Sequence, residues 1–206
     1  MLAAIAATIV IGYLLGNLNG SVLISRLVVH DDVRRHGSGN AGFTNFFRIY
    51  GGINSLIVML IDGLKAAAAC LIGGLLMEQY GLRLEGMAAA ALAVSLGHDF
   101  PALLGFRGGK GIVSGFAALI VIDWRIALAV FAVFAVVYLS TYYVSLSSIM
   151  GAVTYGAGFV IVYHSRPVVM VLGLAVACLA VFMHRENIVR LAKGTERKTN
   201  FFRKGN

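Results

Sequence analysis

The sequence is organised around the stretch R-R-H-G-S-G-N-A-G-F-T-N-F-F-R, residues 34–48. These fifteen residues hold three glycines, three arginines, two asparagines, one serine and one threonine. The rest of the chain is mostly apolar: 59% of its 206 residues are hydrophobic and 13% are charged, and the mean hydropathy is +0.86. Soluble domains carry about 25% charged residues, and a membrane-spanning helix needs ~20 apolar residues. The composition predicts an all-α integral membrane protein, and we expect this loop to bind a phosphate group where the membrane meets water.

Seven apolar segments predict seven transmembrane helices within a single membrane-embedded domain, residues 1–206. The segments are 2–27, 53–77, 86–104, 112–122, 126–144, 149–163 and 167–183. The first has no basic region before it, so we expect a spanning helix and not a cleaved signal. Segment 112–122 is short for a ~30 Å hydrocarbon core at a rise of about 1.5 Å per residue. We expect it to tilt, to extend back through the preceding glycines or to insert partly. The polar residues Ser145–Ser148 predict a break before residue 149.

Basic residues are distributed unevenly between the two sides that seven crossings create. One side receives three, and the other receives thirteen, namely Arg26, Arg34, Arg35, Arg48, Arg107, Lys110, Arg185, Arg190, Lys193, Arg197, Lys198, Arg203 and Lys204. The positive-inside rule then predicts an outside N-terminus and a cytoplasmic C-terminus. It also places three polar stretches, 34–48, 97–111 and 184–196, on the cytoplasmic face. We expect Arg197–Lys204 to bind anionic lipid headgroups.

The glycines of the first stretch match the pattern G-x-G-x-x-G over residues 37–42. The surrounding chain lacks the βαβ unit of a dinucleotide site, which excludes that interpretation. Such glycines can still turn backbone N–H groups inward to bind an anion, and Ser38 adds a hydroxyl. Thr44 and Arg48 share one face if a helix begins there, and a guanidinium is a forked donor suited to phosphate. The alternative is a flexible turn.

The second stretch contains G-G-K-G, residues 108–111. It lacks the spacing of a nucleotide-binding P-loop, and no Ser or Thr follows Lys110, which excludes an NTPase of that kind. A glycine turn with a lysine before a helix is nevertheless suited to phosphate. The alternative is an ordinary basic cytoplasmic loop.

His184 and Asn187 lie three residues apart after the last apolar segment, and a histidine there can act as base or donor. The alternative for a lone histidine is a hydrogen-bonding role at a helix end, which we expect for His98. Asp62 and Lys65 share a helix face and predict a buried ion pair, which is structural or, as the alternative, catalytic.

Familiar catalytic and metal-binding patterns are absent from the sequence. No His-x4-Asp and no G-x-S-x-G pattern occurs. Cys70 and Cys178 lie in apolar segments without metal-ligand spacing, and we expect both to be small buried side chains. We therefore predict neither a metal nor a cofactor.

Together the three polar stretches resemble the bacterial acyl-phosphate:glycerol-3-phosphate acyltransferase (PlsY) family. The stretches are G-S-G-N-A-G-F-T-N-F-F-R (37–48), G-H-D-F-P-A-L-L-G-F-R-G-G-K-G (97–111) and H-R-E-N-I-V-R-L-A-K-G-T-E (184–196). With seven apolar segments, the resemblance covers essentially the whole chain. It implies a bacterial inner-membrane enzyme with a cytoplasmic active site that makes 1-acyl-glycerol 3-phosphate from acyl phosphate and glycerol 3-phosphate. It implies no nucleic acid and no obligatory protein partner; membrane lipid is the expected surroundings.

The resemblance also implies roles for particular residues. The catalytic group comprises Ser38, Arg48, Lys110, His184 and Asn187. The phosphate-binding group comprises Gly39, Asn40, Thr44, Asn45, Gly108, Gly109, Gly111 and Ser145. Glu186 is expected to be structural. The sequence departs from the family's usual pattern at Phe43, Arg107 and residues 113–115, which bears on substrate fit more than on the reaction.

The expected reaction is a direct attack by the glycerol 3-phosphate hydroxyl on the acyl phosphate. Arg48, Lys110 and the backbone of the first loop would neutralise the leaving phosphate. The proton has two possible acceptors, His184 and a substrate phosphate oxygen. The rival interpretations are a transporter of a phosphorylated metabolite, which would be expected to show internal repeats and midplane polar residues, and a lipid-binding scaffold.

Overall fold

The computed structural model describes residues 1–199, and every regular element in that range is a helix. The prediction of an all-α protein is confirmed. The α-helices are α1 (Leu2–Asn17), α2 (Gly20–Leu27), α3 (Phe43–Tyr50), α4 (Gly52–Glu78), α5 (Arg83–Asp99), α6 (Ile112–Ile122), α7 (Trp124–Thr141), α8 (Val144–Tyr163), α9 (Pro167–Met183) and α10 (Arg185–Ala192). Two 3-10 turns, η1 (Val33–Arg35) and η2 (Ala102–Leu104), lie in the loops.

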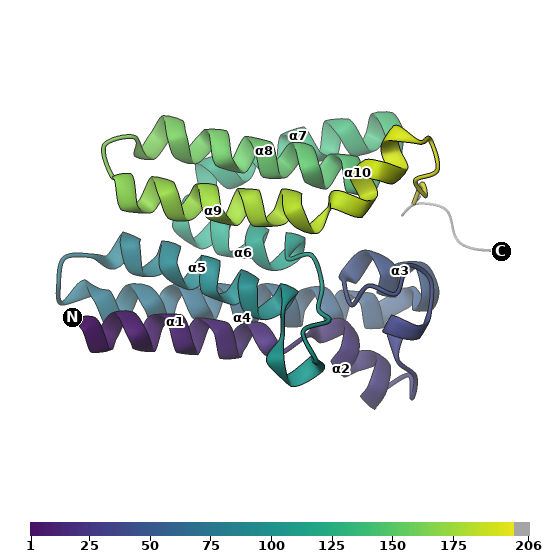
Figure 1. Ribbon diagram of the computed structural model, residues 1–206, viewed down its shortest axis with the longest axis horizontal. Coiled ribbons are helices and arrows are strands. Elements are labelled where there is room, and N and C mark those ends of the chain that lie inside the picture. The colour runs from purple at the N-terminus through teal and green to yellow at the C-terminus, as the bar shows by residue number, and fades with distance from the viewer. Residues whose placement is uncertain (200–206) are drawn as a thin grey trace.

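The long helices form two layers that run along the same axis (Figure 1). α1, α4 and α5 pack on one another in the first layer, while α7, α8 and α9 form the second. The short helix α6 lies between the layers, where it contacts α4, α5 and α7. α2, α3 and α10 gather at one end of the bundle, opposite the end that carries Met1 (Figure 1). The polar stretches expected to cooperate therefore come from both layers.

Small residues allow the first layer to pack closely. A Cβ added to Gly97 of α5 would lie 2.1 Å from the Tyr13 carbonyl oxygen of α1, and one added to Gly16 would lie 2.4 Å from the Val94 carbonyl oxygen. No side chain fits at either contact, so glycine is required for α1 and α5 to approach this closely. Small residues at helix contacts are characteristic of helices packed in membranes.

The first apolar segment consists of two helices, because Leu18 and Asn19 interrupt it. The side chain of Asn19 accepts a hydrogen bond from the Val22 N–H and so caps α2. The Lys65 ammonium donates to the carbonyl oxygens of Gly16 and Leu18, which the interruption leaves without helical partners. A charge buried in α4 thus stabilises the break in the neighbouring helix.

Two expectations about the apolar segments were wrong. Ser145–Ser148 do not break a helix but form the first turns of α8, because Ser147 and Ser148 donate to the carbonyl oxygens four residues earlier. The interruption lies at Tyr142, which has a left-handed backbone with φ of 59°. Cys178 is exposed on the outside of α9, although Cys70 is buried.

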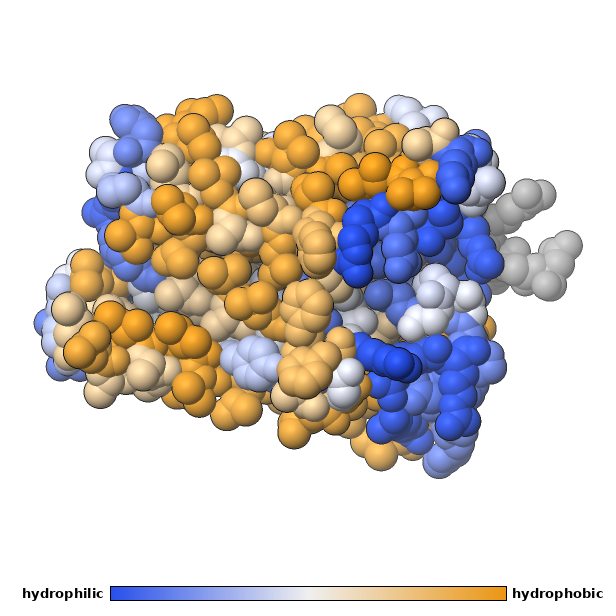
Figure 2. Space-filling model, in the orientation of Figure 1, coloured by the Kyte–Doolittle hydropathy of each residue, from blue (hydrophilic) through white to orange (hydrophobic). Residues whose placement is uncertain are grey.

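Five helical segments of the described chain are long and apolar enough to cross a membrane, and a sixth is counted if α9 and α10, which meet at 52°, form one span. α6 has eleven residues, as its sequence suggested. Figure 2 shows apolar residues over the length of the bundle and hydrophilic residues gathered at the end with α2, α3 and α10. This distribution is that of an integral membrane protein with one large polar end.

Candidate active site

A cavity of about 480 Å³ lies at the polar end of the bundle. It is lined by all three polar stretches, by the start of α8 and by Asp62 of α4. Ten of the residues predicted to form the site line this cavity: Ser38, Asn40, Thr44, Asn45, Arg48, Lys110, Gly111, Ser145, His184 and Asn187. Gly108 and Gly109 lie in the loop beside it, whereas Gly39 is exposed and does not line it.

The first stretch is tied to the second through Arg34 and Asn40. Arg34 pairs with Asp32 at 2.8 Å and donates to the Leu104 carbonyl oxygen at 3.2 Å. The hydrogen bonds from the Arg34 guanidinium to Asp32 hold the pKa of that carboxyl well below its usual range. The Asn40 side-chain amide donates to the Gly108 carbonyl oxygen at 3.5 Å. The loop 34–42 is thereby held against the glycine-rich loop 105–111.

Asn45 organises the first loop from within. It is buried, with an exposed fraction of 3%, and its amide nitrogen donates to the carbonyl oxygens of Val33, His36 and Asn40. Its Oδ1 accepts from the Ser38 N–H at 2.9 Å. These contacts occupy both donors of the amide and one lone pair of its oxygen, so the loop itself uses most of its hydrogen-bonding capacity.

Helix α3 places Thr44 and Arg48 on the cavity face, one turn apart, as their spacing predicted. The Arg48 guanidinium does not stand free in the cavity. Its Nε donates to the Thr199 hydroxyl at 2.6 Å, and its Nη2 donates to the Arg197 carbonyl oxygen at 3.2 Å. Residues 196–199, hereafter the tail strap, thus cross from α10 to α3. Residues 200–204, predicted to bind lipid, lie outside the described residues.

The glycine-rich loop is fixed by the end of α5. The N–H groups of Gly108 and Gly109 donate to the carbonyl oxygens of Asp99 and His98 at 3.2 and 3.1 Å. Lys110 then reaches across to the second layer and donates to Asn187 Oδ1. Burial lowers the pKa of the Lys110 ammonium to about 8, and the positive charge of Arg190 adds to this effect. A bound anion would therefore stabilise the charged form of Lys110.

Glu196 holds the second-layer side of the cavity together. One of its oxygens accepts from Ser145 and from Asn187, each at 2.8 Å, and the other accepts from Arg190 at 2.7 Å. Burial alone would raise the pKa of Glu196, but these hydrogen bonds lower it below its ordinary value. The side chain of Glu196 is 3% exposed, which marks it as part of the site.

Glu186, for which a structural role was predicted, lies instead on the surface. Its side chain is 72% exposed and reaches Arg190 at 3.8 Å. The exposed position of Glu186 does not support the structural role predicted for it. Glu196, ten residues later, makes the contacts that such a role requires.

His184 lies at the junction of α9 and α10 and is buried. Its Nδ1 lies 2.7 Å from the Ala180 carbonyl oxygen. A carbonyl oxygen can only accept, so the ring proton of the neutral histidine is on Nδ1 and Nε2 carries the lone pair. Nε2 has no hydrogen-bond partner among residues 1–199, and the residue lines the cavity. His184 can therefore accept a proton or a hydrogen bond from a molecule bound there.

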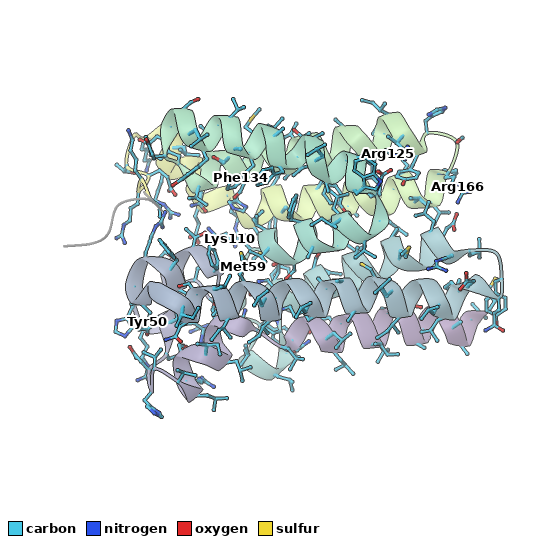
Figure 3. The ribbon with its side chains drawn as sticks, turned by 180° about the vertical axis from the view of Figure 1, so that it is seen from behind. Tyr50, Met59, Lys110, Arg125, Phe134 and Arg166 are labelled. Carbon is cyan, nitrogen blue, oxygen red and sulfur yellow. The ribbon has the colours of Figure 1, made fainter. Side chains whose placement is uncertain are left out.

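A second cavity of about 520 Å³ continues from the first between the two layers. It shares Lys110 and Phe134 with the first cavity, and most of its lining is apolar. Figure 3 shows Lys110 between the layers with Met59 of α4 and Phe134 of α7 on either side. Met59 and Ile120 on its lining are 38% and 50% exposed on the apolar surface. The second cavity therefore opens sideways toward the region that lipid would occupy.

The sequence missed two residues that the structure places at the site. Glu196 ends the third stretch, but only the turn at Gly194, with φ of 67°, folds it back onto Ser145 and Asn187. His98 lies in the last turn of α5 and bonds Lys65, as expected of a hydrogen-bonding residue at a helix end. The sequence did not indicate that it is buried and also lines the cavity. The predicted Asp62–Lys65 pair is confirmed, with Nζ and Oδ1 2.7 Å apart. Among residues 1–199, no group of three or more His, Cys, Asp or Glu side chains could hold a metal ion.

The fold and cavity define an integral membrane protein in which a cation-lined, glycine-rich cavity opens into an apolar one. The protein-family model described as glycerol-3-phosphate acyltransferase matches residues 6–194. A glycerol-3-phosphate acyltransferase of Thermoanaerobacter sp. (strain X514) is 38% identical over 191 residues, which cover 93% of each chain. One of Clostridioides difficile (strain 630) is 36% identical over 195 residues and 92% of each chain.

Two solved structures are similar along nearly the whole chain. The glycerol 3-phosphate form of PlsY (YgiH), an integral membrane glycerol 3-phosphate acyltransferase, matches with a TM-score of 0.84 and 30% identity, over 95% of this chain and 96% of that one. Its lysophosphatidic acid form matches with a TM-score of 0.80 and 28% identity, over 96% of each. The chain belongs to the glycerol-3-phosphate acyltransferase family.

Proposed function

We propose that this protein transfers a fatty acyl group from acyl phosphate to the sn-1 hydroxyl of glycerol 3-phosphate. The products are 1-acyl-glycerol 3-phosphate and phosphate, and the reaction is the first acylation of phospholipid synthesis. One observation carries this proposal: three stretches far apart in the sequence line a cavity that continues into an apolar cavity between the layers. Such a pair of cavities suits a phosphate joined to a fatty chain.

The two substrates would meet at Lys110, the charged residue that lines both cavities. The acyl chain lies between the layers, and its phosphate lies among Ser38, Thr44, Arg48 and Lys110. The glycerol 3-phosphate lies against Gly108–Gly111 with its hydroxyl toward His184. Fixed cations in a buried site stabilise the charge that develops on the departing phosphate. No covalent acyl-enzyme is needed, because the acyl phosphate is already an activated anhydride.

His184 receives the proton in this scheme. The hydroxyl oxygen forms a bond to the acyl carbon as the carbon–oxygen bond to phosphate breaks. His184 Nε2 accepts the hydroxyl proton and passes it to the released phosphate, which leaves as hydrogen phosphate. Asn187 and Ser145 orient the site through Glu196, and Asn45 shapes the first loop and need not contact substrate directly. No cofactor takes part.

The topology proposed is seven crossings of the bacterial inner membrane within one domain, with the N-terminus outside and the C-terminus cytoplasmic. α6 and the bent pair α9–α10 complete the five longer spans. Arg125 and Arg166 lie at the end away from Lys110 (Figure 3), and the excess of basic residues at the other end favours a cytoplasmic site. A transporter is disfavoured, because the polar cavity lies at one end of the bundle.

The test is acyl transfer by the purified full-length chain in lipid nanodiscs. Long-chain acyl phosphate and glycerol 3-phosphate should give lysophosphatidic acid and one phosphate per turnover, whereas acyl-CoA in place of acyl phosphate should give none. Counter-flow of glycerol 3-phosphate in sealed vesicles, without acyl product, would support the transporter and overturn the proposal.

A further inference from the structure

His98 is a second histidine on the lining of the first cavity, on the wall opposite His184. It lies in the last turn of α5, is 3% exposed, and packs against the glycine-rich loop. A Cβ added to Gly109 would lie 2.1 Å from His98 Nε2. This ring nitrogen therefore touches the loop at the one position where the absence of a side chain leaves room for it.

The neighbours of Lys65 fix its charge. Its ammonium nitrogen lies 2.7 Å from Asp62 Oδ1 and 3.2 Å from the Gly16 carbonyl oxygen, and it also reaches the Leu18 carbonyl oxygen. These three groups accept hydrogen bonds and cannot donate them. Lys65 is therefore a protonated donor. Its fourth neighbour is His98 Nδ1, 2.8 Å away.

A protonated lysine determines the tautomer of His98. An ammonium group has three N–H donors and no lone pair, so Nδ1 can only accept in this contact, and two of the four acceptors around Lys65 share one N–H. The single ring proton of the neutral histidine then lies on Nε2. Nε2 has no hydrogen-bond partner among residues 1–199, and His98 lines the cavity, so this donor is available to a molecule bound there.

We propose that His98 is a substrate-binding residue whose Nε2–H donates a hydrogen bond to the phosphate of glycerol 3-phosphate, with Lys65 and Asp62 as positioning residues that fix its tautomer. This inference rests on the proposed function. It assigns His98 to the acceptor substrate because Nε2 lies against Gly109, in the loop that we place around that substrate. Asp62 also accepts from the Gly20 N–H at 3.1 Å, which anchors the pair to α2.

A neutral histidine is well suited to this task. It donates to a phosphate without adding another positive charge to a cavity that already holds Arg48, Lys110 and Arg190. It also cannot take a proton at Nδ1 while Lys65 donates there. The acceptor substrate is therefore held by a donor that does not compete with His184 for the hydroxyl proton.

The steady-state test compares His98→Asn with His98→Gln in nanodiscs. Asparagine keeps an oxygen acceptor near the Nδ1 position for Lys65 but has no atom at the Nε2 position, whereas the glutamine amide reaches that position. His98→Asn should raise the KM for glycerol 3-phosphate by about tenfold to a hundredfold, as expected for a lost hydrogen bond to a charged group. The KM for acyl phosphate should stay within about twofold, and His98→Gln should recover most of the loss.

The tautomer is tested independently on the wild-type protein by NMR of ¹⁵N-labelled histidine. His98 should carry its proton on Nε2 and His184 on Nδ1, and glycerol 3-phosphate should shift the His98 Nε2–H signal. The reverse tautomer at His98, or an unchanged KM in a folded His98→Asn protein, overturns the proposal. If the wild-type chain makes no acyl product, the proposed function fails, whereas the NMR titration still reports whether His98 meets the phosphate.

Discussion

The two walls of the first cavity each present a histidine, and the two residues are prepared for opposite tasks. In the first layer, His98 Nδ1 accepts a hydrogen bond from Lys65, so Nε2 carries the ring proton and can donate it to a ligand. In the second layer, His184 Nδ1 donates to a backbone carbonyl oxygen, so Nε2 carries a lone pair and can accept a proton or a hydrogen bond. In each histidine the hydrogen-bond partner of Nδ1 therefore decides whether Nε2 donates or accepts.

The supports of the two walls also differ. The first wall rests on an ion pair buried within α4, both of whose side chains are at most 3% exposed. The second wall rests on Glu196, which arrives from a loop after α10 and binds Ser145, Asn187 and Arg190. We expect the first wall to be rigid, because its support lies within the helix bundle. We expect the position of the second wall to depend on the contacts of the chain after α10.

Replacing Lys110 should have the largest effect, because this residue joins the two walls through Asn187. Lys110→Ala removes the cation that both cavities share, and turnover should fall by at least about a thousandfold. Lys193→Ala, at an exposed position of the same charge, is the matched control and should remain active. A Lys110→Ala enzyme with more than a tenth of wild-type kcat would contradict the proposed site.

Replacing His184 tests the accepting side of the comparison. His184→Ala should lower kcat by about 10²–10⁴, the usual contribution of a positioned acid–base group, with a smaller change in the KM for either substrate. His164→Ala, at an exposed position after α8, should behave as wild type. If His184→Ala turns over at a near-normal rate, the proton goes directly to a substrate phosphate oxygen.

Two nearby glutamates provide a matched pair for the support of the second wall. Glu196→Gln should lower kcat/KM by about tenfold to a hundredfold, because a neutral amide cannot hold Arg190 and Asn187 as the carboxylate does. Glu186→Gln should change it less than about twofold, because an exposed ion pair contributes little. Equal effects in steady-state assays would remove the distinction drawn between the two residues.

The pH dependence of kcat/KM examines Lys110 itself. Its pKa is lowered to about 8 by burial and then by Arg190, with Glu196 and Glu186 opposing. Below that pH the ammonium is charged and binds phosphate; above it, the charge is lost and kcat/KM should fall by up to tenfold per pH unit. In Lys110→Arg the alkaline limb should move to higher pH, because a guanidinium keeps its proton. An identical alkaline limb in that variant would assign the limb to another group.

The smallest effect concerns the tail strap. Thr199 accepts from Arg48 at 2.6 Å, so a phosphate must displace this contact to use the same donor. Thr199→Val removes the hydroxyl at nearly constant volume and should lower the KM for acyl phosphate by about twofold to tenfold. Thr195→Val, a substitution at an exposed threonine outside the strap, is the control. A raised KM would show that the strap shapes the site and does not compete for it.

Much of the fold was readable from the sequence because spanning helices leave a simple hydropathy pattern. The bounds of α6 and α9 coincide with their apolar segments, and Phe43 begins a helix that aligns Thr44 with Arg48. The start of α8 was missed because serine reads as a breaker, while its hydroxyl can satisfy a carbonyl oxygen within the helix.

The supports of the site were harder to predict because they depend on contacts between segments far apart in the sequence. Asn45 appears in the sequence as a ligand, and only the folded loop shows that Val33, His36 and Asn40 use its amide. The orientation of His98 depends on Lys65, thirty-three residues earlier. No local pattern contains that pairing, because α4 and α5 must pack before it exists.

The sideways opening between Met59 and Phe134 bears on how the protein meets its lipid substrate. A fatty chain that enters from the hydrocarbon is governed by its mole fraction among the lipids and not by its concentration in the buffer. Diluting a fixed amount of acyl phosphate with more bilayer lipid should therefore slow the reaction at constant volume. The lysophosphatidic acid product can likewise diffuse directly into the leaflet, already positioned for the next enzyme that works there.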